Sequence, residues 1–106
     1  MSVAYKILIG GYDHPKLFND AANVDKLQRW LKNNGWEYAS FKKLTQGDGI
    51  AFWYCDYIKN LDQDVFKIMV KQLQWSDDFF LMISSNSDPF KLHIGDVDIS
   101  LAIESI

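Results

Sequence analysis

The chain has 106 residues, of which 48% are hydrophobic and 15% are aromatic, and its formal net charge is −3. This length fits one domain with an ordinary core, and this apolar content excludes an intrinsically disordered chain. Because Cys55 is the single cysteine, an internal disulfide framework and a cysteine-based zinc site are excluded. We therefore expect residues 1–106 to form a single domain.

The charge is distributed unevenly along the chain. Residues 1–55 carry seven basic and five acidic side chains, whereas residues 56–106 carry four basic and nine acidic ones. Phosphate recognition needs clustered cations, preferably arginines, and Arg29 is the only arginine, so the composition disfavours nucleic acid as a partner. No apolar run approaches the length of a signal-peptide core or a membrane helix, which predicts a cytoplasmic protein without a membrane partner.

The first elements are a strand and a helix. Residues 3–9 are rich in β-formers, and we expect this strand to end at Gly10-Gly11. A helix is predicted to begin at about residue 21 or 24 and to end at residue 34, with Asp20 or Asn23 as the N-terminal cap and Gly35 just past the C-terminus. The apolar face of this helix repeats at spacings of three and four and consists of Val24, Leu27, Trp30 and Leu31.

Two further strands are predicted in the middle of the chain. Residues 36–44 alternate with a change of phase at 39–40, which indicates a bulge, and residues 45–49 form a glycine-containing hairpin loop. Residues 50–58 are apolar on both faces, which is typical of a central strand. One face of this strand is predicted to carry Ile50, Phe52 and Tyr54, and the other Ala51, Trp53, Cys55 and Tyr57.

The C-terminal half is predicted to form a helix, a strand and a hairpin. The helix covers residues 61–75 with Asn60 as its cap and Gln63 as the capping-box partner, and the strand covers residues 79–84. A turn at 86–89 leads to a hairpin with Gly95-Asp96 at its turn. The helix is expected to bury a stripe of five residues, namely Leu61, Val65, Ile68, Met69 and Leu73.

The order of these elements is βαββαβ followed by a β-hairpin. The first six elements are those of the ferredoxin-like, split βαβ arrangement, in which two helices cover one face of a four-stranded antiparallel sheet. We therefore predict an α+β domain with this ferredoxin-like sheet and an additional C-terminal hairpin. The other face of the sheet is then covered by the hairpin, by a second copy of the chain or by a partner.

The sequence contains no constellation typical of catalysis. His14 and His93 have no spacing that favours a metal site, and we expect both to be exposed. Cys55 lies among aromatic residues on the predicted central strand, where a cysteine is usually a small core residue. The sequence therefore predicts no catalytic residue, no cofactor and no metal, and hence a protein that is not an enzyme.

One segment is similar to part of a known signature. The run Gly49-Ile50-Ala51-Phe52-Trp53-Tyr54-Cys55 resembles the third-strand signature of the RNA recognition motif family, with Ala51 and Phe52 in matching places. The resemblance implies that aromatic side chains on the open sheet face stack on bases. The segment departs from the signature at Asp48, Ile50 and Cys55, where that family has a basic residue and two aromatic residues.

The aromatic surplus and the acidic second half favour contact with another protein. We expect a small inhibitor that occludes a basic surface of its partner, as immunity proteins and phage anti-CRISPR proteins do by analogy of size and charge. The alternatives are an RNA-binding domain, and a small-ligand protein or enzyme that uses the open sheet face; a homodimer is compatible with all of these. The predicted contacts are Asp77, Asp78, Asp88, Asp96 and Asp98, with Trp53 and Tyr57 as anchors.

Overall fold

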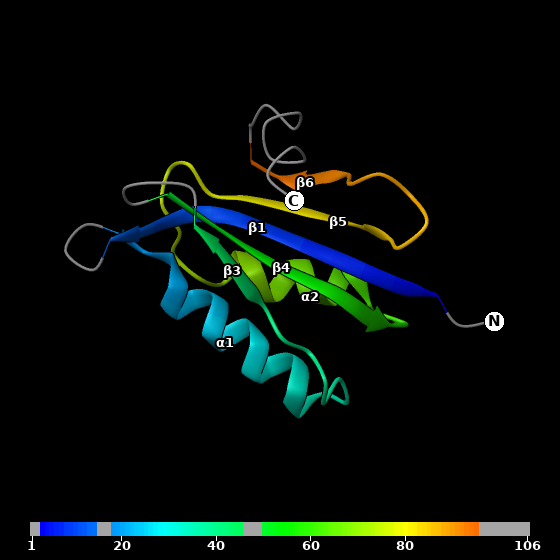
Figure 1. Ribbon diagram of the computed structural model, residues 1–106. Coiled ribbons are helices and arrows are strands. Elements are labelled where there is room, and N and C mark those ends of the chain that lie inside the picture. The colour runs from blue at the N-terminus through cyan, green and yellow to red at the C-terminus, as the bar shows by residue number, and fades with distance from the viewer. Residues whose placement is uncertain (1–2, 15–17, 46–49, 96–106) are drawn as a thin grey trace.

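The structure, a computed structural model, describes residues 3–14, 18–45 and 50–95, without the side chains of 13, 14, 18, 19, 45 and 50. It has the α+β composition predicted from the sequence (Figure 1). The elements in chain order are β1 (Ala4–His14), β2 (Phe18–Asn19), α1 (Asp20–Asn33), β3 (Lys42–Thr45), β4 (Ile50–Lys59), α2 (Gln63–Lys71), β5 (Phe80–Ser85) and β6 (Leu92–Ile94).

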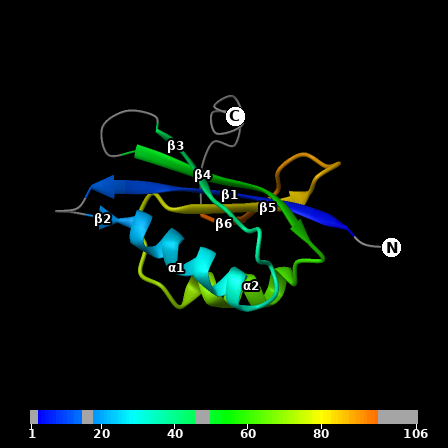
Figure 2. The same ribbon diagram turned by 60° about the horizontal axis from the view of Figure 1, so that its bottom comes forward.

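The strands form one antiparallel sheet. Its order is β3-β4-β1-β5-β6, and the short β2 pairs with β1 off this path. Figure 2 shows α1 and α2 side by side on the same face of the sheet. Because β4 has a neighbour on each side, the prediction of a central strand at residues 50–58 is confirmed. The first strand of the predicted hairpin is also confirmed as β6, which extends the sheet beyond β5, whereas its second strand and its turn residue Asp96 lie outside the described residues.

The prediction that the first strand ends at its two glycines is wrong. Strand β1 continues through Gly10 and Gly11 to His14. A Cβ atom at Gly10 would overlap the ring of Phe80, and one at Gly11 would overlap the carboxylate of Asp20. The glycines therefore allow neighbouring side chains to approach the backbone of a central strand, rather than ending it.

Helix α1 ends as predicted but begins differently. Gly35 has a φ of 104°, and the amide of Trp36 donates to the carbonyl of Leu31, which is the pattern of a glycine-terminated helix. At the start of the helix, the buried carboxylate of Asp20 accepts hydrogen bonds from the backbone amides of Tyr12 (2.9 Å) and Ser76 (3.1 Å) and from the Ser76 hydroxyl (2.6 Å). Asp20 thus ties the helix to β1 and to the segment before β5.

The predicted strand at residues 36–44 is present only in its last part, since β3 covers Lys42–Thr45. The preceding segment runs beside the outer end of β4 without pairing as a strand. The Trp36 indole N–H donates to the carbonyl of Lys59 (2.7 Å), and the amide of Phe41 donates to the Gln28 side chain (2.8 Å). Side chains therefore hold this segment in place, and the backbone ladder begins only at Lys42.

The helix predicted at residues 61–75 is shorter, and it buries other residues than predicted. Asp62, not Asn60, is its N-cap and accepts from the amide of Val65 (3.2 Å), while Asn60 has a φ of 56° in the turn that ends β4. The helix buries Phe66 and Val70, whereas Val65 and Ile68 of the predicted stripe are exposed. The prediction failed because it placed Phe66, a ring at the centre of the core, on the outer side.

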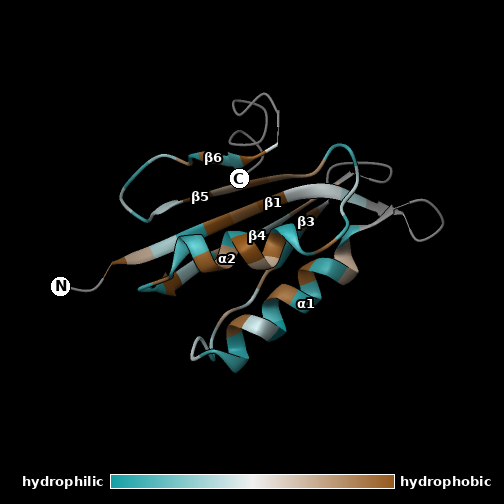
Figure 3. Ribbon diagram, turned by 180° about the vertical axis from the view of Figure 1, so that it is seen from behind, coloured by the Kyte–Doolittle hydropathy of each residue, from teal (hydrophilic) through white to brown (hydrophobic). Residues whose placement is uncertain are grey.

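The sheet has apolar residues on both faces. The helix-side core includes Ile7, Ile9 and Leu81 from the sheet and is completed by residues of both helices; in Figure 3 the hydrophobic stretches of β1 and β5 are coloured brown. The opposite face carries a smaller group, the second-face cluster. Its members are Leu8, Phe80 and Met82, with Phe52, Tyr54, Phe90 and Leu92 packed against them.

Candidate functional site

The structure separates the acidic residues predicted as contacts. Asp77 and Asp78 are exposed in the segment between α2 and β5, and Asp88 is exposed in the turn between β5 and β6. These two segments lie at opposite ends of the sheet, because Phe80 pairs with Gly10 and Ser85 pairs with Tyr5. Asp96 and Asp98 lie outside the described residues.

Asp78 has a partner of its own at its end of the sheet. It forms a hydrogen bond with the Tyr12 side chain, and this bond, together with the carboxylate charge, raises the pKa of Tyr12. Its position therefore has a local structural explanation that does not require a partner protein.

The two predicted aromatic anchors lie in different environments. Trp53 is 4% exposed and belongs to the helix-side core, whereas the side chain of Tyr57 is 61% exposed. Their predicted common face is interrupted by an irregularity in the pairing of β4 with β1, where Ile7 is opposite Cys55 but Tyr5 is opposite Ile58. The irregularity turns Ile58 inward in place of Tyr57, so Trp53 has no surface to offer and Tyr57 does.

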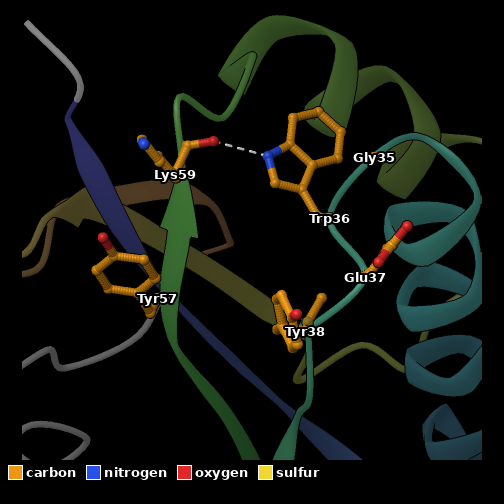
Figure 4. A pocket seen from close by; sticks show the side chains of 7 residues that line it. Gly35, Trp36, Glu37, Tyr38, Tyr57 and Lys59 are labelled. Atoms are coloured by element: carbon orange, nitrogen blue, oxygen red, sulfur yellow. Dashed lines mark hydrogen bonds between the residues drawn. The ribbon is translucent and has the colours of Figure 1, made fainter.

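Tyr57 has an exposed aromatic neighbour that the sequence did not single out. Tyr38, in the turn after α1, is 93% exposed. Figure 4 shows the two tyrosines on either side of the end of β4, next to a depression of about 340 Å³. We call this region the tyrosine edge; its lining residues are Gly35, Trp36, Glu37, Tyr38, Ala39, Tyr57 and Lys59.

The floor of the tyrosine edge is rigidly built. The indole of Trp36 bonds to the Lys59 carbonyl and packs on Trp30, with 6.0 Å between ring centroids. The amide of Ala39 donates to the carbonyl of Trp36 (3.1 Å), which closes the turn that carries Tyr38. Buried contacts thus fix the backbone on both sides of the depression, while the two tyrosine rings face outward.

Acidic side chains gather near the tyrosine edge. Glu37 and Asp56 are exposed next to the two tyrosines. The Asn86 side chain donates to the carbonyl of Asp56 (2.7 Å), which holds the β5–β6 turn against this part of β4. Asp88 in that turn accepts a hydrogen bond from the Ser85 hydroxyl (2.6 Å), so the structure brings two of the predicted contacts, Asp88 and Tyr57, to the same end of the sheet.

A second depression, of about 480 Å³, lies between the β5–β6 turn and the start of α2. It is lined mainly by polar side chains, among them Tyr5, Gln63, Lys91 and His93. His93 is half-buried rather than exposed as predicted, and a ring nitrogen lies 3.1 Å from the carbonyl of Ile83. Burial lowers the pKa of His93, with Lys67 and Lys91 adding to the effect.

The other groups singled out for chemistry do not come together. Cys55 is buried in the core as predicted, and burial raises the pKa of its thiol against the opposing backbone amides of Ser40 and Tyr57. The side chain of His14 is not described. Among residues 3–14, 18–45 and 50–95, no three His, Cys, Asp or Glu side chains are grouped so that they could hold a metal ion.

The second face carries the aromatic residues of the segment that resembles the RNA recognition motif signature. Phe52 and Tyr54 belong to the second-face cluster. Phe52 packs on Phe80 with 5.9 Å between centroids, and Tyr54 meets the edge of Phe90 at 6.1 Å. Both rings are therefore engaged within the chain, and their central-strand neighbour is the fully buried Leu8 rather than an aromatic residue.

Comparisons with protein-family models, with curated proteins and with solved structures return no match for this chain. In the described part of the chain, neither helix has the length and the apolar character required to cross a membrane. The candidate site consequently depends on the geometry of the tyrosine edge alone.

Proposed function

We propose that the chain is a protein-binding module without catalytic activity, and that the tyrosine edge is its contact site. The observation that carries this proposal is exposure. Among the aromatic side chains that the structure describes, Tyr38 and Tyr57 are the two that are exposed, and they flank a depression with a fixed floor. Tyrosine is enriched at interface hot spots because its large rigid ring loses little conformational entropy on binding.

The charge next to these rings supports a basic partner. Glu37, Asp56 and Asp88 are exposed around the tyrosines, with Lys59 as the basic residue among the lining side chains. An arginine of a partner could stack on a tyrosine ring and pair with one of these carboxylates. The proposed function is therefore that of a small cytoplasmic inhibitor, of the kind represented by immunity proteins and anti-CRISPR proteins, which occludes a basic surface.

We also propose the ferredoxin-like arrangement for the first six elements. Apart from the short β2, the strand order β3-β4-β1-β5 is that of the second, third, first and fourth strands of a βαββαβ unit, and all pairs are antiparallel. Both helices lie on one face of this sheet. In this arrangement the tyrosine edge is the outer end of the third strand, next to the loop that follows the first helix.

The test has two steps, partner capture and affinity. The tagged full chain is used to capture proteins from its native host, and the captured protein is purified and titrated against variants. We expect the double substitution Tyr38→Ala and Tyr57→Ala to weaken binding by about 30-fold or more, since a hot spot contributes about 2 kcal/mol or more. Ile68→Ala is the matched control, because Ile68 is similarly exposed, at 57%, but lies on α2.

Salt separates the acidic contribution from the aromatic one. The substitutions Asp56→Asn and Asp88→Asn should reduce the association rate and its dependence on ionic strength, because exposed charges act mainly on the encounter of the two proteins. The proposal is wrong if no stoichiometric partner is captured, or if the double tyrosine variant binds as tightly as the unmodified chain. Recovery of RNA in place of a protein would favour the alternative function.

A further inference from the structure

The sheet face opposite the helices is more deeply buried than its position predicts. Leu8 and Met82 are 0% exposed, and Phe80 is 3% exposed, although α1 and α2 lie on the other face. The remaining members of the second-face cluster are half-buried. A face that waits for a partner would leave the centre of such a cluster accessible to water, so something within one copy of the chain covers it.

Two aromatic pairs cover the cluster at its ends. Phe52 and Phe80 meet above Gly10, since both pair with this glycine across the sheet. Phe90 reaches from the segment before β6 to the edge of Tyr54, with the Lys6 ammonium group 4.6 Å from its ring centroid. Between these pairs lies the row formed by Tyr54, Leu8, Met82 and Leu92, which are successive partners across β4, β1, β5 and β6. The pairs are walls, and Leu8 and Met82 form the floor between them.

The segment that can cover this floor is the C-terminal one. Eleven residues follow Gly95, and the apolar positions Val97, Ile99, Leu101 and Ile103 alternate with Asp98, Ser100, Ala102 and Glu104. This alternation gives one apolar side to an extended segment. The other segments outside the described residues, 1–2, 15–17 and 46–49, hold two to four residues and have no such alternation.

The chain leaves the sheet beside the second-face cluster. Gly95 has a φ of 104°, and a Cβ atom there would come within 2.7 Å of the Phe79 carbonyl oxygen and of Cβ of Phe80. Seven extended residues span about 23 Å, at about 3.3 Å each. Because Leu8 and Phe80 lie on adjacent strands, this length is ample for the segment to reach Leu8.

We propose that residues 97–103 lie across the second face and bury Leu8 and Met82, instead of forming a further strand beside β6. A strand added beside β6 would lie three strand spacings from β1, or about 14 Å, and could not cover Leu8. A second copy of the chain is not needed, because the burial exists within one copy. This inference does not depend on the proposed function, which concerns another surface and another assay.

A double-mutant cycle in the full-length chain tests the contact. Leu8→Val and Leu101→Ala should each lower the urea midpoint, and the double variant should lower it by less than the two shifts combined, because the residues share a contact. Ile9→Val paired with Leu101→Ala is the matched control, since Ile9 is the next residue of β1 and faces the helix-side core; these shifts should add. Additive shifts for Leu8 and Leu101 would overturn the proposal.

Photo-cross-linking keeps the proposal testable if a variant of this cycle fails to fold. A benzophenone side chain is placed at Phe90, or at Tyr38 as the control, and the irradiated protein is digested and analysed by mass spectrometry. We expect the probe at Phe90, but not the one at Tyr38, to react with residues 97–103 of the same molecule. Cross-linking between two copies, or the absence of any product with residues 97–103, would contradict the proposal.

Discussion

The aromatic side chains of β4 differ sharply in what they contact. Phe52 and Tyr54 pack against Phe80 and Phe90 on the second face, whereas Tyr57 is exposed at the tyrosine edge with Tyr38 across the strand end. One irregularity in the pairing with β1 lies between these groups. The comparison teaches that an aromatic-rich strand serves two purposes: rings with partners inside the chain stabilise the fold, and rings without such partners are available for contact.

The largest contrast is expected between the stability effects of these two groups. Phe80→Ala removes a ring that is almost fully buried and should lower the free energy of unfolding by about 3–5 kcal/mol. Tyr57→Ala removes a mostly exposed ring and should change it by about 0.5 kcal/mol or less. Urea denaturation of the two variants measures both values, and similar losses would break the comparison.

The buried carboxylate of Asp20 sharpens the contrast at the other end of the sheet. Asp20→Ala leaves the amides of Tyr12 and Ser76 without an acceptor and should cost about 3 kcal/mol, since an unsatisfied buried donor costs about 1–3 kcal/mol. Asp25→Ala is the control, because Asp25 is exposed on the same helix. At temperatures where the variant stays folded, partner binding should be unchanged; a loss of binding would link the two ends.

The close approach of Phe80 to Gly10 predicts a smaller, conditional effect. Gly10→Ala should lower the free energy of unfolding by about 1–3 kcal/mol, because the added methyl group overlaps the Phe80 ring. In a Phe80→Ala background the same substitution should be nearly neutral, since the ring is gone. Denaturation of the four proteins of this cycle gives the result, and an equal cost in both backgrounds would show that the ring is not the cause.

The smallest effect concerns His93, which lies between the two regions on β6. Because burial lowers its pKa in the folded state, its contribution to stability is complete above the ordinary pKa of about 6.5. It is lost as the pH falls below that value, since the unfolded chain then binds the proton more tightly. His93→Gln should therefore reduce the loss in urea midpoint between pH 7 and pH 5, and an unchanged loss would assign the pH dependence to other groups.

The sequence pattern predicted the order of elements well and the details of the site poorly. Alternation in residues 50–58 and the three-and-four spacing of Val24, Leu27 and Leu31 report burial directly, so β4 and α1 could be found. Side-chain contacts between distant segments have no such local signal: nothing in the sequence links Gly10 with Phe80, or the Trp36 indole with the Lys59 carbonyl. The exposure of Tyr38 depends on that indole contact, which is why Tyr38 was missed and Trp53 was chosen instead.

The proposal that exposed tyrosines mark the contact site is tested most directly by hydrogen–deuterium exchange of the chain with and without its captured partner. We expect the partner to slow exchange at backbone amides of residues 36–41 and 55–59, with little change in α2 or on β6. Slower exchange confined to α2, to β6 or to the segment between α2 and β5, with the tyrosine edge unaffected, would contradict the proposed interaction surface.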